Sequence, residues 1–107
     1  MSDLEDFYRH AAECAKTLHQ AFSQLPAHKM TVSRARRCLA RARTAFGEPE
    51  VAHQRRVRLC RTALQHLEQA IVNFETDAPI TELASGLRQA DRSLRRVQVA
   101  DLGCSPE

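Results

Sequence analysis

Five arginines fall within eleven consecutive positions in the segment SRARRCLARAR, residues 33–43. A guanidinium group offers planar, charge-assisted hydrogen bonds that match the oxygens of phosphates and carboxylates. The chemistry that this segment indicates is therefore the recognition of an anion. On a helical wheel Ser33, Ala40 and Thr44 point outward between two rows of arginines, and such small side chains would let a phosphate backbone or another helix approach closely. One row is Arg34, Arg37 and Arg41, and the other is Arg36 and Arg43.

Basic charge continues beyond this segment into the next predicted helix. Residues 29–61 hold ten basic residues against Glu48 and Glu50, whereas residues 1–28 and 62–107 are each net acidic. Such a local excess, concealed within a total charge of +3, favours an anionic partner. The nucleic-acid-binding residues predicted on this basis are Arg34, Arg36, Arg37, Arg41, Arg43, Arg55, Arg58 and Arg61. A secondary basic row is predicted on the outer face of the last helix, at Arg88, Arg92, Arg95 and Arg96.

Three interpretations of these arginines stay open. The favoured one is sequence-independent binding of RNA or DNA through backbone phosphates. No zinc-finger, helix-turn-helix or RNA-recognition signature is present, and the aromatic side chains fall on or beside predicted core stripes. The alternative is an interaction module that docks an acidic protein or forms a homo-oligomer. The third is a solvated face in an arginine-rich chain, with acids of the first and last helices neutralising part of the charge.

Catalysis and cofactor binding are not expected. The polar residues worth testing are His53 and Arg56, which occupy a core-facing line of the third predicted helix and form a possible polar core site. A buried arginine requires a partner, and a histidine there could titrate near neutrality. The simpler interpretation is that this end of the helix is poorly covered, or that Arg56 pairs with an acid such as Glu13. His10 and Cys14 lie one turn apart but lack the further ligands that a stable metal site needs.

The four cysteines lack the close spacing of a zinc or redox motif, and in a reducing compartment they are expected to be thiols. Cys14, Cys38 and Cys60 fall on predicted apolar stripes, where cysteine behaves as a small core residue. If the second and third helices fold back on each other, Cys38 lies nearly level with Cys60. We therefore hypothesise that these two thiols can form a disulfide on oxidation, and that Cys104 is the reactive thiol.

Four helices are predicted to position these residues. The composition is rich in alanine, leucine and arginine and holds only three glycines, which is typical of helical proteins. Apolar residues recur at seven-residue spacing, and the pattern breaks near Pro26, Pro49 and Pro79. Gly47 stands where a left-handed C-terminal cap is expected. The predicted helices span about residues 2–25, 32–46, 49–75 and 80–99.

The short connections between these helices predict an all-α, antiparallel up-down-up-down four-helix bundle. The chain is long enough for one hydrophobic core but not for two. Residues 1–100 are therefore expected to form a single domain and residues 101–107 a disordered tail. No apolar run approaches the ~18–20 residues that cross a bilayer, and the acidic start does not resemble a secretory signal. A cytoplasmic accessory protein without membrane contact is the expectation.

Overall fold

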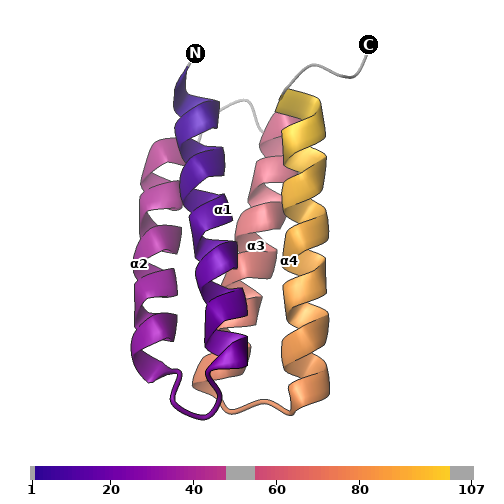
Figure 1. Cartoon of the computed structure of the whole chain (residues 1–107). Helices are drawn as coiled ribbons and strands as arrows, with labels where there is room; N and C mark the ends of the chain where they lie inside the picture. The colour runs from indigo at the N-terminus through magenta and orange to yellow at the C-terminus, as the bar shows by residue number, and fades with distance from the viewer. Residues whose placement is uncertain (1, 48–54, 102–107) are drawn as a thin grey trace.

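The computed structural model describes residues 2–47 and 55–101. Within them four helices follow one another along the chain: α1 (Ser2–Ser23), α2 (Lys29–Phe46), α3 (Arg55–Glu75) and α4 (Ile80–Asp101). Successive helices run in opposite directions and lie side by side in an elongated body of 43 × 23 × 19 Å (Figure 1). The predicted all-α, up-down four-helix bundle is confirmed. None of these four helices has an apolar stretch long enough to cross a membrane.

Helix boundaries differ from the prediction around the first connection. α1 ends two residues early and α2 begins at Lys29, three residues before its predicted start, so both predicted bounds were wrong. The Nδ1–H of His28 donates to the carbonyl oxygen of Pro26 at 3.0 Å. The hydroxyl of Thr31 donates to the side-chain oxygen of Gln24 at 2.5 Å. Because these side chains fix the turn, α2 starts one turn before its apolar stripe.

The remaining bounds follow the sequence more closely. Gly47 ends α2 with a φ of 69°, and its N–H donates to the carbonyl oxygen of Arg43 at 3.1 Å, so the predicted left-handed cap is confirmed. α4 begins at Ile80 as predicted and includes Asp101, which was wrongly placed in the tail. The predicted start of the third helix at residue 49 and the remaining tail residues lie outside the described residues.

A continuous apolar core runs along the axis of the bundle. Its largest fully buried apolar members come from all four helices: Phe7, Leu18, Leu39, Leu67, Ile71 and Val97. Cys14, Cys38 and Cys60 are buried in the same core, which confirms their predicted place. Burial and the neighbouring Cys38 raise the pKa of Cys14 to about 12, because both disfavour its thiolate. The disulfide between Cys38 and Cys60 stays a prediction.

The four helices pack as two close hairpins. α1 packs most extensively against α2, and α3 against α4. Within the second hairpin Gly86 allows a close approach, since a Cβ atom there would lie 3.0 Å from the side-chain nitrogen of Asn73. The two hairpins meet along two looser interfaces, which we call the α2/α3 seam and the α1/α4 seam.

Candidate anion-binding surfaces

α2 divides its arginines between two of its faces. Arg36 and Arg43, seven residues apart, turn toward α3 at the α2/α3 seam. Arg36 holds Glu75 through two hydrogen bonds, with its Nε and Nη2 each 2.9 Å from a carboxylate oxygen. Glu68 joins both arginines, at 3.2 Å from Arg36 and 3.1 Å from Arg43. We call these four side chains the seam network.

The seam network favours the charged form of its members. Burial raises the pKa of Glu68, but the hydrogen bonds and charges of Arg36 and Arg43 outweigh this effect and lower that pKa below its ordinary value. Hydrogen bonds to Glu75 and Glu68 raise the pKa of Arg36 in turn. Two of the five clustered arginines are therefore neutralised within the molecule. The acids that do this belong to α3, and not to the first and last helices that the sequence suggested.

The other three arginines of the segment lie on an exposed face of α2. Arg34, Arg37 and Arg41, which we call the outer α2 row, make no ion pair with any carboxylate in the described part of the chain. Arg41 borders a shallow depression of about 330 Å³ between α1 and α2, which Ala40 and Thr44 also line. Both small residues are exposed, as the helical wheel predicted.

The arginines predicted on the third helix lie at the end of the bundle where α2 finishes (Figure 1). Arg55, Arg58 and Arg61 occupy the first two turns of α3 and are exposed. Because α2 and α3 are antiparallel, this group places basic charge beside the C-terminal end of α2. The eight predicted residues thus do not form one continuous face. They divide into two arginines at the α2/α3 seam, the three of the outer α2 row and the three at the start of α3.

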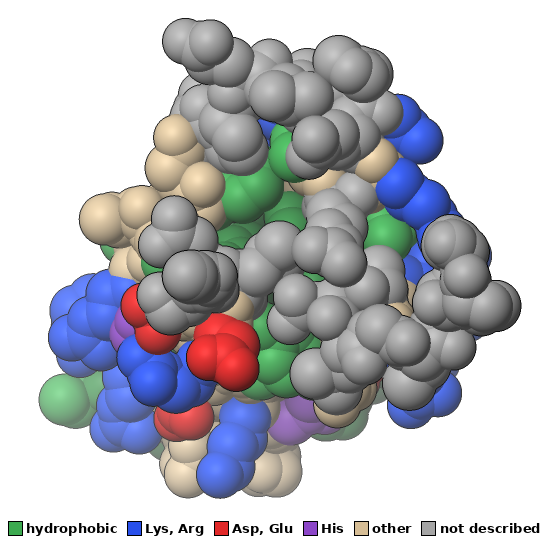
Figure 2. Space-filling model, turned by 90° about the horizontal axis from the view of Figure 1, so that it is seen from above, with side chains coloured by type: hydrophobic (Ala, Val, Ile, Leu, Met, Phe, Trp, Pro, Cys, Tyr) green, Lys and Arg blue, Asp and Glu red, His purple; other side chains and the backbone are tan. Residues whose placement is uncertain are grey.

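The secondary basic row is exposed along α4, at Arg88, Arg92, Arg95 and Arg96. Seen along the bundle axis, Lys and Arg side chains gather on the side of α2 and on the opposite side, toward α4 (Figure 2). The molecule therefore carries two separate basic surfaces. The sequence analysis predicted the surface on α2 as the main binding site and the row on α4 as a secondary one. Of the possible polar core site, His53 lies outside the described residues, and only the backbone of Arg56, in the first turn of α3, is described.

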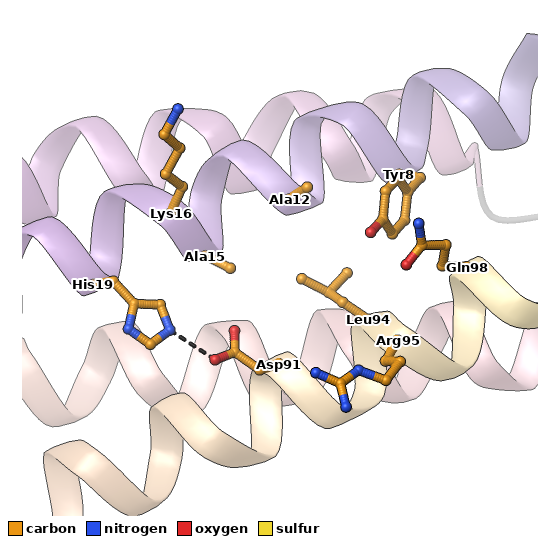
Figure 3. A pocket seen from close by; sticks show the side chains of 9 residues that line it. All are labelled: Tyr8, Ala12, Ala15, Lys16, His19, Asp91, Leu94, Arg95 and Gln98. Carbon is orange, nitrogen blue, oxygen red and sulfur yellow. Dashed lines mark hydrogen bonds and ion pairs between the residues drawn. The ribbon is translucent and has the colours of Figure 1, made fainter.

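A groove that the sequence analysis missed opens along the α1/α4 seam, with a volume of about 410 Å³ (Figure 3). His19 and Asp91 close one end, with the Nε2 of His19 2.7 Å from a carboxylate oxygen of Asp91. Tyr8 and Gln98 approach each other at the other end (Figure 3). The lining residues are Tyr8, Ala12, Ala15, Lys16 and His19 of α1 and Asp91, Leu94, Arg95 and Gln98 of α4. We call this site the α1/α4 groove.

The sequence held one signal for this groove. Tyr8, Ala12, Ala15 and His19 recur at spacings of four, three and four residues, so they line one face of α1. This face lies beside the core stripe, and its two alanines are too small to fill the space toward α4. Small residues between two larger polar ones indicate a groove only when the residues that face them on the neighbouring helix are known. The groove could therefore not be located from the row alone.

Metal binding finds no support in residues 2–47 and 55–101, where no three His, Cys, Asp or Glu side chains gather closely enough to hold an ion. Function must accordingly be argued from the two basic surfaces and the groove. No protein-family model, curated protein or solved structure matches the chain.

Proposed function

We propose that this protein is a small noncatalytic bundle that binds nucleic acid through backbone phosphates, without reading base sequence. The observation that carries the proposal is the division of arginines on α2. Arg36 and Arg43 hold glutamates, whereas the outer α2 row is exposed and unpaired among the described residues. A guanidinium that holds no internal carboxylate gives up no ion pair when it meets a phosphate. The outer α2 row is therefore the part of the predicted set best suited to phosphate binding.

The spacing of the row supports this choice. Between Arg34 and Arg41 the helix rises about 10 Å. This length corresponds to roughly three nucleotides along one strand, at ~3.4 Å each. Ser33 and Ala40 are exposed beside the row and small enough for a backbone to approach the helix. Arg55 and Arg61, at the end of the bundle, would contact phosphates farther along the strand.

Fluorescence anisotropy with labelled single-stranded RNA, single-stranded DNA and duplex DNA, at several salt concentrations, tests the proposal. The test variant carries Arg34→Gln, Arg37→Gln and Arg41→Gln together. Because each arginine lost removes one phosphate contact, the slope of log affinity against log salt should shrink by about 2–3. The strand type that binds best identifies the partner class.

A control variant separates the effect of the positions changed from the effect of the altered net charge. The variant Gln20→Glu, Gln65→Glu and Gln89→Glu lowers the net charge by the same amount at exposed residues outside every predicted binding set. The proposal requires that the α2 variant lose far more affinity than this control. Absence of binding at low salt, or equal losses in both variants, would refute the assignment to the outer α2 row.

A second candidate is an adaptor that docks an acidic protein on the same face. Met30 favours it, because this side chain is 83% exposed and stands one turn before Arg34 in line with the outer α2 row. An exposed methionine is a typical apolar anchor in protein interfaces. Met30→Ser separates the candidates, since phosphate contact needs no such anchor. Unchanged nucleic-acid affinity supports the first, and loss of a copurifying acidic protein supports the second.

A further inference from the structure

The α1/α4 groove combines an apolar floor with polar groups of different kinds at its two ends. Ala12, Ala15 and Leu94 supply the floor. Its volume of about 410 Å³ falls within the ~300–1,000 Å³ range of small-ligand sites. We infer that this groove binds a single nucleotide, with the base at the Tyr8 end and the phosphate at the Arg95 end. The inference rests on the proposed function, which supplies the nucleotide as an unpaired residue of a bound strand, and a free mononucleotide is the other source.

The Tyr8 end has the chemistry to hold a base. Tyr8 is half-buried, and Figure 3 shows its hydroxyl pointing toward α4, with the amide of Gln98 beside the ring. An aromatic ring offers a face on which any base can stack. The amide of Gln98 offers one donor group and one acceptor, which suits the mixed donor and acceptor edges of bases. The sequence analysis had placed Tyr8 beside the core, so the structure adds an aromatic group to a polar surface.

The other end has the charge to hold a phosphate. Lys16 of α1 and Arg95 of α4 both line the groove; the amine of Lys16 points away from α4, whereas the side chain of Arg95 extends along α4 toward Asp91 (Figure 3). The carboxylate of Asp91 is engaged by His19 at 2.7 Å, which limits its repulsion of an anion. Arg95 is therefore the cation nearest to an anion in the groove, and Lys16 adds a second positive charge on the α1 rim. An anionic group is thus complementary to the Arg95 end, and an uncharged base to the Tyr8 end.

The secondary basic row connects the groove to a strand. Arg88, Arg92 and Arg95 follow one another at spacings of four and three residues and are all exposed. They therefore lie on one face of α4 and lead away from the groove. A strand with one nucleotide in the groove would place neighbouring phosphates on this row. This arrangement gives the secondary row a role that the outer α2 row does not duplicate.

The experiment uses the full chain and two probes, adenosine 5′-monophosphate and a short single-stranded oligoadenylate. Binding is followed by amide chemical shifts in two-dimensional NMR, with affinities from titration. Both probes should shift amides of residues that line the groove. Arg95→Glu should weaken binding of the mononucleotide by about tenfold to a hundredfold, because a hydrogen bond to a charged group is lost. Arg96→Glu, an equal charge change on the same helix but outside the groove, should change it less than about twofold.

A second variant fills the groove without changing charge. Ala12→Phe places a ring over the floor at a half-exposed position and should abolish the shifts at the groove. Binding of the mononucleotide alone supports the inference with a free nucleotide as the source and counts against the proposed function. Oligoadenylate binding that is lost in the outer α2 row variant, yet insensitive to Arg95→Glu and Ala12→Phe, supports the proposed function and overturns the inference. Absence of binding by both probes overturns the inference, whereas the proposed function is decided by the anisotropy titrations with the three strand types.

Discussion

The two seams between the helical hairpins are built in opposite ways. The α2/α3 seam is bridged by long, paired side chains of the seam network, with Glu68 at its centre. The α1/α4 seam is bridged at one end by His19 and Asp91, and small residues such as Ala12 leave it hollow. The difference shows that two interfaces around a single core can be packed in different ways. One seam fixes the hairpins relative to each other, and the other leaves room for a ligand.

The largest expected contrast between the seams concerns core leucines. Leu67→Ala should lower the free energy of unfolding by about 3–4 kcal/mol, because the side chain is fully buried and its removal leaves an enclosed cavity. Leu94→Ala should cost only about 2 kcal/mol, since this leucine borders the α1/α4 groove and its removal widens an existing hollow. Urea unfolding followed by circular dichroism measures both values.

Leu87 provides the control for this contrast, because it lies two turns before Leu94 on α4, is buried and does not line the groove. Leu87→Ala should therefore resemble Leu67→Ala. If Leu94→Ala proves as costly as both of these, the α1/α4 seam is packed as tightly as the rest of the core and the comparison fails.

Substitutions that enlarge a side chain should show the same contrast between the core and the α1/α4 groove. Ala35 of α2 is fully buried, so Ala35→Leu should overpack the core and cost about 1–3 kcal/mol. Ala12→Leu should cost less than about 0.5 kcal/mol, because the added atoms enter the groove. Thermal unfolding of the two variants side by side is sufficient. A loss for Ala12→Leu comparable to that for Ala35→Leu would show that the groove has no room for a side chain.

Substitutions in the polar contacts of the two seams should differ less in unfolding free energy than the substitutions of apolar residues. Glu68→Gln removes the charge that joins two arginines and should cost about 1 kcal/mol. Asp91→Asn removes a single contact whose side chains are 51% and 43% exposed, and should cost about 0.3 kcal/mol. Both values are modest because the groups are partly exposed and water screens them. Unfolding at low and high salt measures the values, and a salt-independent loss for Glu68→Gln would contradict an electrostatic origin.

The contrast between the seams also marks what the sequence could reveal. Seven-residue apolar spacing and prolines were enough for four helices and a bundle, because both are local or periodic signals. A signal for the seam network was present as well, since Arg36 and Arg43 share the seven-residue spacing of Glu68 and Glu75. Equal spacing on two helices predicts a contact only if the helices are known to be adjacent and their relative register is known. These depend on how the hairpins meet, which the spacing within one helix does not specify.

The earlier start of α2 and the α1/α4 groove escaped prediction for related reasons. Lys29 begins the helix because His28 and Thr31 bond to the preceding connection, and such bonds depend on the path of the turn. The groove exists because two rows, one on α1 and one on α4, fail to fill the space between them. Neither feature belongs to a single periodic pattern. Contacts that join separate elements were thus the part of the site that required the structure.

The smallest expected effect is the pH dependence of the α2/α3 seam. The pKa of Glu68 lies below its ordinary value of 4.5 in the folded protein, so its ionised form is stabilised by folding. This contribution is present above pH 4.5 and is lost as the pH falls through the lower, folded-state pKa. The difference in unfolding free energy between the wild type and Glu68→Gln should accordingly shrink as the pH falls from neutral to an acidic pH at which the carboxyl is protonated in the folded protein. A difference for Glu68→Gln that stays constant down to that pH would mean that shape, and not charge, closes the α2/α3 seam.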